Sequence, residues 1–249
     1  MSGQIRLDKF LADAGKGTRS EVKQAIQKSR VFVNGQLEKK PERKVEPDAD
    51  EIILDGRQVS YEKHVYFMMN KPQGVVSATE DSRDATVVGL LDAKDRKGVF
   101  PVGRLDKDTE GLLLLTNDGE LAHRLLSPKK HVPKCYYAKV DGFVTEEDRQ
   151  RIAGGIQISE DFTALPGKLE ILSHTEGISE ILLTIYEGKF HQVKRMMKAC
   201  GKEVLYLKRV KMGGLMLDEG LNPGEYRRLS KEELQRLENL DKFSCRQGV

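Results

Sequence analysis

The sequence predicts an α+β protein in which a small N-terminal module precedes a larger domain built on a mainly antiparallel sheet. Two observations favour this fold class. The first 60 residues hold two amphipathic helix patterns followed by strand and turn signals, and the rest of the chain mixes short apolar strands with helices. A length of 249 residues suits one medium domain together with a small one.

The N-terminal module begins with a helix whose apolar residues, between positions 7 and 14, share one face. A second helix begins near Thr18, because Thr18 and Glu21 have the spacing of a capping box. Strand and turn signals follow at residues 31–33, 34–35 and 51–56. These elements form a compact helix–helix–hairpin module, which we place at residues 1–60.

The larger domain begins with an apolar strand at residues 65–69, which ends at a turn containing proline and glycine at residues 70–74. Further strands are predicted at residues 99–102, 112–115, 136–140, 169–172 and 181–185. Helices are predicted at residues 86–91, 120–126, 146–152 and 192–200, and a last capped helix begins at residue 230. We assign residues 64–238 to this domain and residues 239–249 to a C-terminal tail.

Composition limits the class of protein. Hydrophobic residues make up 38% of the chain and charged residues 33%, which is typical of a soluble globular protein. No apolar run has the length of a membrane span, and the first ten residues carry charges where a signal peptide needs an apolar stretch. We therefore expect a cytoplasmic protein. Neither a disulfide framework nor a metal site is expected, because of the spacing of Cys135, Cys200 and Cys245 and of His123 and His131.

The net charge of +3 is unevenly distributed. Residues 5–30 carry a net charge of +4 and residues 186–211 a net charge of +6, so the remainder of the chain is acidic. Two concentrated basic segments favour a polyanionic partner, because each neutralised phosphate releases counterions. The alternative is that both segments are ordinary solvated helical faces.

One loop holds an arginine and two carboxylates between an expected strand and a very apolar one. Arg104, Asp106 and Asp108 lie in this loop, which is a plausible place for an active site. The alternative is structural: either aspartate caps a turn, and Arg104 pairs with it at the surface.

The N-terminal module resembles a known RNA-binding family. Residues 6–35, RLDKFLADAGKGTRSEVKQAIQKSRVFVNG, are similar to the S4 domain of ribosomal protein S4 and of several RNA-modifying enzymes. In that family the two helices present basic side chains to structured RNA. The resemblance therefore implies RNA contacts by Arg6, Lys9, Arg19, Lys23, Lys28 and Arg30.

The larger domain resembles the RsuA/RluA superfamily of pseudouridine synthases from about Val65 to Leu229. Residues 102–119, VGRLDKDTEGLLLLTNDG, are similar to its catalytic signature. Three further motifs occur in the family's order: the lysine–proline–glycine motif at residues 70–74, the lysine–x–tyrosine motif at residues 134–136, and the glycine–basic–x–His–Gln–x–basic motif at residues 188–194.

The resemblance implies an isomerase without metal or cofactor. The reaction breaks the bond from uracil N1 to ribose C1′, rotates the base and rejoins it through C5, with no net oxidation or hydrolysis. An ionised carboxylate can start it either by attacking C1′ or by removing a ribose proton, and both routes stay open. The family's catalytic aspartate falls on Asp106.

Other roles follow from the same motifs. Lys194 is the expected ion partner of Asp106, with Arg195 next in line, although lysine cannot make the bidentate contact of the arginine found in many relatives. Tyr136 is expected to stack on the uracil, with Tyr137 as an alternative one residue away, and Arg104 to occupy the gap left in the RNA. An isolated tyrosine in a strand is otherwise more often part of the core. The remaining expected RNA contacts are Lys71, Lys189, His191 and Arg195.

The segment from Ser127 to Lys134 and the S4 module are most similar to the small-subunit enzyme of the superfamily, whose substrate is uridine 516 of 16S rRNA. A large-subunit (23S) enzyme is the first alternative. A non-catalytic rRNA-binding assembly protein is a second, disfavoured by the joint presence of Asp106, Tyr136 and Lys194. The expected partner is thus ribosomal RNA, and we expect the protein to be a monomer.

Overall fold

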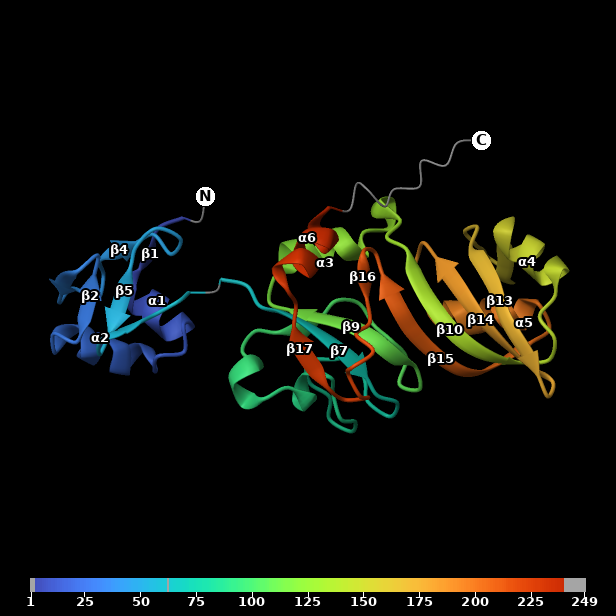
Figure 1. Ribbon diagram of the computed structural model, residues 1–249, viewed down its shortest axis with the longest axis horizontal. Helices are drawn as coiled ribbons and strands as arrows, with labels where there is room; N and C mark the ends of the chain where they lie inside the picture. The colour runs from blue at the N-terminus through green and yellow to red at the C-terminus, as the bar shows by residue number, and fades with distance from the viewer. Residues whose placement is uncertain (1–2, 62, 240–249) are drawn as a thin grey trace. The chain divides into compact units, whose positions relative to one another are not determined.

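The computed structural model describes residues 3–61 and 63–239, so Cys245 and all of the expected tail except Asn239 lie outside the described residues. The chain divides into two compact units, residues 1–64 and residues 65–249 (Figure 1). Helices and antiparallel sheets occur in both units, and the expected α+β class is confirmed.

The first unit packs two helices against a small sheet. Thr18 caps the second helix: its side chain accepts from the amide of Glu21 while Glu21 accepts from the amide of Thr18, which confirms the capping box. Asn34 and Gly35 both have positive φ, as a two-residue hairpin turn requires. The elements are β1 (Ile5–Arg6), α1 (Leu7–Asp13), α2 (Arg19–Gln27), β2 (Val31–Val33), β3 (Gln36–Glu38), β4 (Lys44–Val45), β5 (Ile52–Leu54) and β6 (Arg57–Gln58).

The second unit is organised by a nine-stranded sheet with the order β13-β14-β10-β15-β9-β7-β17, in which β16 also pairs with β15 and β8 with β9. Every pairing in this sheet is antiparallel except that of β15 with β9. Its strands are β7 (Tyr66–Lys71), β8 (Phe100–Pro101), β9 (Glu110–Thr116), β10 (Lys134–Asp141), β13 (Lys168–Thr175), β14 (Ile178–Ile185), β15 (Glu203–Met212), β16 (Leu215–Met216) and β17 (Tyr226–Arg228).

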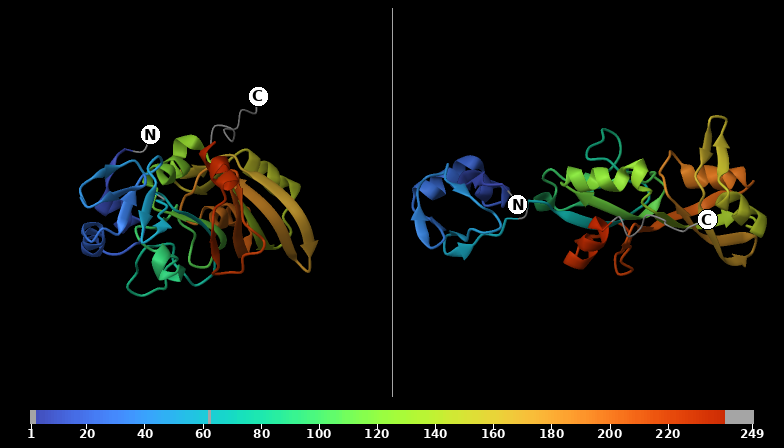
Figure 2. Two further views of the ribbon diagram at one scale, coloured as in Figure 1. Left: turned by 60° about the vertical axis from the view of Figure 1, so that its left-hand side comes forward. Right: turned by 90° about the horizontal axis from the view of Figure 1, so that it is seen from above.

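Helices cover the sheet in two groups. Leucines of α3 (Gly119–Leu126) and α6 (Lys231–Glu238) belong to one apolar cluster. Figures 1 and 2 show α4 (Glu146–Ala153) and α5 (Gln192–Ala199) at the other end of the sheet, where Arg151 of α4 donates to the carbonyl of Ala199. A separate hairpin pairs β11 (Ile156–Ser159) with β12 (Phe162–Ala164). The expected helix at residues 86–91 is instead one 3-10 turn, at Val88–Leu90.

Both faces of the central strands are buried. Leu113 and Leu115 of β9 belong to one apolar cluster, and Leu112 and Leu114 belong to another. Because successive side chains of a strand point to opposite faces, β9 lies between two cores. The loop before β9, residues 103–109, is consequently attached to the most buried strand of the unit.

The parallel pairing of β9 with β15 brings two backbones unusually close. Gly111 lies opposite Arg209 and has a φ of +102°. A Cβ atom at position 111 would lie 2.3 Å from the carbonyl oxygen of Arg209. Only glycine fits there, because real Cβ contacts do not approach so closely and because this φ is strained for other residues.

Candidate active site

The loop that carries Asp106 is fixed by hydrogen bonds from neighbouring segments. The hydroxyl of Ser77 donates to the carbonyl of Leu105 at 2.9 Å and accepts from the Leu105 amide at 3.0 Å. Within the loop, the amide of Thr109 donates to the carbonyl of Asp106 at 3.0 Å. The backbone on both sides of Asp106 is therefore held in one conformation.

Lys71, at the end of β7, lies in the interior of the protein and not at the surface where an RNA contact was expected. It is fully buried, so the expectation that it contacts RNA is corrected. Its ammonium donates to the carbonyls of Pro72 and Thr109 at 2.9 Å and, more weakly, to that of Lys107 at 3.4 Å. Burial lowers the pKa of Lys71 to about 8, against the opposing effect of nearby carboxylates. Lys71 thus joins the end of β7 to the loop that follows Asp106.

Replacing Lys71 with methionine is expected to destabilise the second unit by about 2 kcal/mol or more, because it leaves buried carbonyls without their donor. The pKa of about 8 lies below that of an exposed lysine, so the unfolded chain binds the additional proton between about pH 8 and pH 10. The contribution of Lys71 to the free energy of unfolding therefore rises with pH in this window. Urea titrations of the wild type and of Lys71→Met at pH 7.5 and pH 9.5 measure this contribution as the difference between their free energies of unfolding. The same difference at both pH values would contradict a lowered pKa for Lys71.

Two side chains at the start of α5, those of its N-cap His191 and of Lys194, lie near Asp106. Nε2 of His191 lies 3.6 Å from one carboxylate oxygen of Asp106, and Nζ of Lys194 lies 3.6 Å from the other. The side chain of Asp106 is about one quarter exposed. His191 was expected to contact RNA, and nothing in its motif spacing indicated that it would face the carboxylate.

Lys194 is shared between two carboxylates. It donates to both oxygens of Asp108, at 2.6 and 2.7 Å, which is closer than its approach to Asp106. These hydrogen bonds hold the pKa of Asp108 below its usual value. The motif resemblance predicted Asp106 as the ion partner of Lys194. In the structure Lys194 lies near both aspartates, and Asp108 is the nearer one.

Arg195 does not reach Asp106. Its guanidinium donates to the carbonyl of Ile158 at 3.1 Å and to that of Phe190 at 3.5 Å. Being next to Lys194 in the chain, it points from a different side of α5. The expectation that Arg195 is a second ion partner of Asp106 is therefore wrong.

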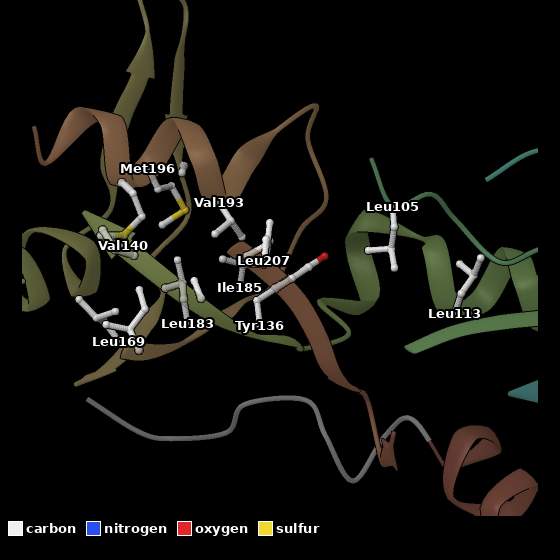
Figure 3. Packing of buried hydrophobic residues seen from close by; sticks show 14 of the residues in the cluster. Leu105, Leu113, Tyr136, Val140, Leu169, Leu183, Ile185, Val193, Met196 and Leu207 are labelled. Carbon is white, nitrogen blue, oxygen red and sulfur yellow. The ribbon is translucent and has the colours of Figure 1, made fainter. Parts of the chain in front are cut away.

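Asp106 opens onto a cavity of about 100 Å³, enough for several water molecules, since one needs roughly 10–15 Å³. Figure 3 shows Tyr136 beside Ile185 and Leu207, with its hydroxyl directed toward Leu105. All four of these residues line the cavity. Its other lining residues are Arg104, Asp106, Thr109, Lys134, Gly188, Lys189, His191, Gln192, Val193 and Arg209.

The cavity distinguishes the two adjacent tyrosines of β10. Tyr136 is 7% exposed and lines the cavity. Tyr137 makes an edge contact with Tyr206, with ring centroids 6.1 Å apart, and does not line the cavity. Arg104 is exposed among the lining residues, and the ammonium of Lys189 lies 5.0 Å from the centre of the Phe162 ring. A carboxylate, an aromatic ring and several cations thus line one cavity.

Comparisons with known proteins identify a family for each of the two units. The family model described as RNA pseudouridylate synthase matches residues 65–199, and that of the S4 domain matches residues 5–52. The chain belongs to the RNA pseudouridine synthase family. The expected resemblance, fold and isomerase class are confirmed.

Several relatives match almost the whole chain of this pseudouridine synthase. The uncharacterized RNA pseudouridine synthase YtzG of Bacillus subtilis is 52% identical over 94% of this chain and 98% of its own. Ribosomal small subunit pseudouridine synthase A of Vibrio cholerae is 40% identical over 92% of this chain and 98% of its own. Ribosomal large subunit pseudouridine synthase B of Bacillus subtilis is 41% identical over 94% and 96%. A crystal structure of a pseudouridylate synthase, 40% identical, superimposes with a TM-score of 0.66 over 94% of this chain and 99% of that one.

The S4 unit of the synthase presents its expected basic residues to solvent. All six side chains, those of Arg6, Lys9, Arg19, Lys23, Lys28 and Arg30, belong to exposed residues. Two of them are engaged: Arg6 forms a two-pronged contact with Asp8, and Arg30 forms one with Asp55. Lys23 lies 3.9 Å from Asp8. Lys9, Arg19 and Lys28 form no ion pair within the described residues.

The part of the chain that the structure describes holds neither a metal cluster nor a helix that could span a membrane. Among residues 3–61 and 63–239, no group of three or more histidine, cysteine, aspartate or glutamate side chains is arranged to hold a metal ion. No helix in the same described residues has the length and apolar character needed to cross a bilayer.

Proposed function

We propose that this enzyme isomerises one uridine of ribosomal RNA, uridine 516 of 16S rRNA, with Asp106 as the catalytic carboxylate. The observation that carries the proposal is the position of Asp106 at a cavity lined by Tyr136, with His191 near one of its carboxylate oxygens and Lys194 near the other. The small-subunit target is supported by relatives of that name at about 40% identity over most of both chains.

The cavity suits an extruded uracil. Flipping a base out of folded RNA costs a few kcal/mol of stacking, and contact with an aromatic side chain recovers part of it. Tyr136 is placed to stack on the base, which sets ribose C1′ near Asp106. Arg104, exposed at the cavity, takes the position vacated in the RNA. Lys189 contacts the phosphates, and His191 and Lys194 orient the carboxylate of Asp106.

Both open routes use the same carboxylate. In one, an oxygen of Asp106 bonds to C1′ as the bond to N1 breaks; in the other, it removes a ribose proton. In either case the base leaves with the bonding electrons and returns through C5. We further propose the division into an S4 RNA-binding domain at residues 1–60, a catalytic domain at residues 64–238 and a tail at residues 239–249. Cofactor-free action as a cytoplasmic monomer stays a prediction.

A large-subunit target is the second candidate, favoured by the 41% identity to a relative named for the large subunit. Chemical mapping of pseudouridine in ribosomal RNA from a deletion strain separates the two candidates. We expect loss at uridine 516 of 16S rRNA, and return of the modification when purified enzyme alone is added to small-subunit ribonucleoprotein. Normal modification of that uridine together with loss at a 23S site would replace the first candidate with the second.

Charge reversal on the second S4 helix is expected to weaken RNA binding. The double variant Arg19→Glu, Lys23→Glu removes two cations from α2, so fewer counterions are released on binding. The slope of log Kd against log salt should fall by roughly 0.7–0.9 for each lost phosphate contact. Single-turnover rates at saturating RNA should change little. Filter binding across a salt series measures the Kd and its salt slope, and pseudouridine formation at saturating RNA measures the single-turnover rate.

The matched control is Lys40→Glu, Arg57→Glu, which changes the charge of the same unit equally at two exposed residues outside the helices. We expect its salt slope to stay closer to that of the wild type. Equal slopes for both double variants would indicate general electrostatic attraction and contradict a specific contact by α2.

A further inference from the structure

Arg209 of β15 is a buried cation that the proposed mechanism leaves without a role. The residue is 2% exposed, and its Nε donates to the carbonyl of Leu112 at 2.8 Å. Its Nη2 is buried and has no hydrogen-bond partner in the described part of the chain. A buried donor left unsatisfied costs about 1–3 kcal/mol, and more when it is charged. Arg209 lines the same cavity as Asp106 and Tyr136.

Two further buried polar side chains, those of Lys134 and Thr109, line this cavity. Lys134 is 8% exposed, and its ammonium donates to the carbonyl of Val132 at 2.9 Å. Burial and the charge of Arg209 lower the pKa of Lys134 to about 8, against the opposing effect of Glu187. The hydroxyl of Thr109 is buried and has no hydrogen-bond partner among the described residues. Neither Arg209 nor Lys134 forms an ion pair within residues 3–61 and 63–239.

The isomerisation creates negative charge that such a site can bind. When the bond from N1 to C1′ breaks, its electron pair stays with the base and spreads over N1 and the two carbonyl oxygens. Water is displaced as the base fills the cavity, so fixed donors replace its solvation. A hydrogen bond from a cation strengthens as this charge develops and therefore lowers the barrier.

We propose that Nη2 of Arg209 donates a hydrogen bond to a carbonyl oxygen of the flipped uracil and stabilises the charge that the base carries after cleavage. This inference rests on the proposed function of the cavity. Arg209 keeps its proton throughout. The electron pair left on the base by cleavage forms the new bond when C5 attacks C1′, and the C5 proton then leaves to a base.

The base is a better ligand for Arg209 than a phosphate of the RNA backbone. Arg104 and Lys189, which also line the cavity, are exposed and accessible to phosphates. Arg209 is 2% exposed and lines the cavity together with Leu207 and Tyr136. A phosphate that reached it would lose its hydration, whereas a planar base carries its carbonyl oxygens into the cavity.

A chemical double-mutant cycle tests the contact directly. Wild-type enzyme and Arg209→Met are compared in single-turnover reactions on RNA carrying uridine, 2-thiouridine or 4-thiouridine at the target position. Sulfur is a weak hydrogen-bond acceptor, so the thio substitution removes the contact from the RNA side. We expect Arg209→Met to slow conversion of uridine by about 10²- to 10³-fold, with little change in the Kd for RNA. One thio substitution should slow the wild type but slow Arg209→Met at least tenfold less.

Matched variants guard against a purely structural effect. Arg96→Met also removes an arginine whose Nε donates to a backbone carbonyl, that of Leu91, and Arg96 does not line the cavity. It should keep its rate on all three RNAs. Arg209→Lys keeps a charge in place if the methionine variant fails to fold, and should show a smaller coupling than the wild type because its ammonium replaces the guanidinium fork.

Two results overturn the inference. Additive effects of Arg209→Met with both thio substitutions would show that Arg209 does not touch a base carbonyl. Wild-type rates on both thio RNAs equal to the rate on uridine would show the same, whatever the variants do. A wild type that isomerises the unmodified RNA while giving either result contradicts the role of Arg209 alone, and failure to convert that RNA contradicts the proposed function itself.

Discussion

Asp106→Asn is expected to lower the single-turnover rate of isomerisation by about 10⁴-fold or more, the scale seen when a reacting side chain is removed. The amide keeps the shape of the carboxylate but has neither its charge nor its basicity, so both open routes are blocked. Folding and RNA affinity should stay near those of the wild type, because the Asp106 side chain is partly exposed and contacts His191 and Lys194 only at 3.6 Å. Pseudouridine formation and RNA binding are measured on the same preparation.

Asp108→Asn is the matched control, two residues away and also acidic. Asp108 is the nearer partner of Lys194, so its loss frees Lys194 to approach Asp106. We expect a change in rate of no more than about tenfold, because the reacting carboxylate remains. An active Asp106→Asn beside an inactive Asp108→Asn would transfer the catalytic role to Asp108.

Gly111→Ala is expected to have the largest effect on stability, about 4 kcal/mol or more, at the upper end for single substitutions. The added Cβ would lie 2.3 Å from the carbonyl oxygen and 2.8 Å from the nitrogen of Arg209, and both are backbone atoms that cannot turn aside. The φ of +102° adds strain. Thermal unfolding should shift downward by about 10 °C or more.

Gly119→Ala provides the comparison for this substitution. Gly119 is the first residue of α3, and a Cβ there would have no heavy atom within 4 Å. Alanine is a better helix former than glycine, so the same chemical change should leave stability unchanged or raise it slightly. Similar losses for both variants would contradict the close approach of β9 and β15.

Sequence periodicity predicted the elements that have strong local signals. The capping box at Thr18, the Asn34–Gly35 turn and the apolar strand β9 all depend on residues close together in the chain. The hairpin of β11 and β12 was missed, because its strands are short and only one face is buried.

The site shows where reasoning from residue type ends. Motif order brought together Asp106 and Tyr136, which line one cavity, and Lys194, which lies 3.6 Å from Asp106, but charge alone does not reveal burial. Lys71 and Arg209 look like other basic residues in the sequence, and both are almost fully buried. Arg209 lies within the basic segment at residues 186–211, most of whose cations are partly or fully exposed, and no periodicity separates it from them. Only the pairing of distant strands sets its position.

The parallel pairing of β9 with β15 also sets the order in which the protein becomes functional on the ribosome. The S4 unit is complete once residue 64 has left the exit tunnel. The loop that carries Asp106 follows soon after, yet β15 ends only at Met212. Until that strand is synthesised, β9 lacks its partner β15 and the cavity lacks the side chains of β15 that line it, so contacts between residues far apart in the chain form last. A nascent chain therefore gains its nucleic-acid module well before its chemistry.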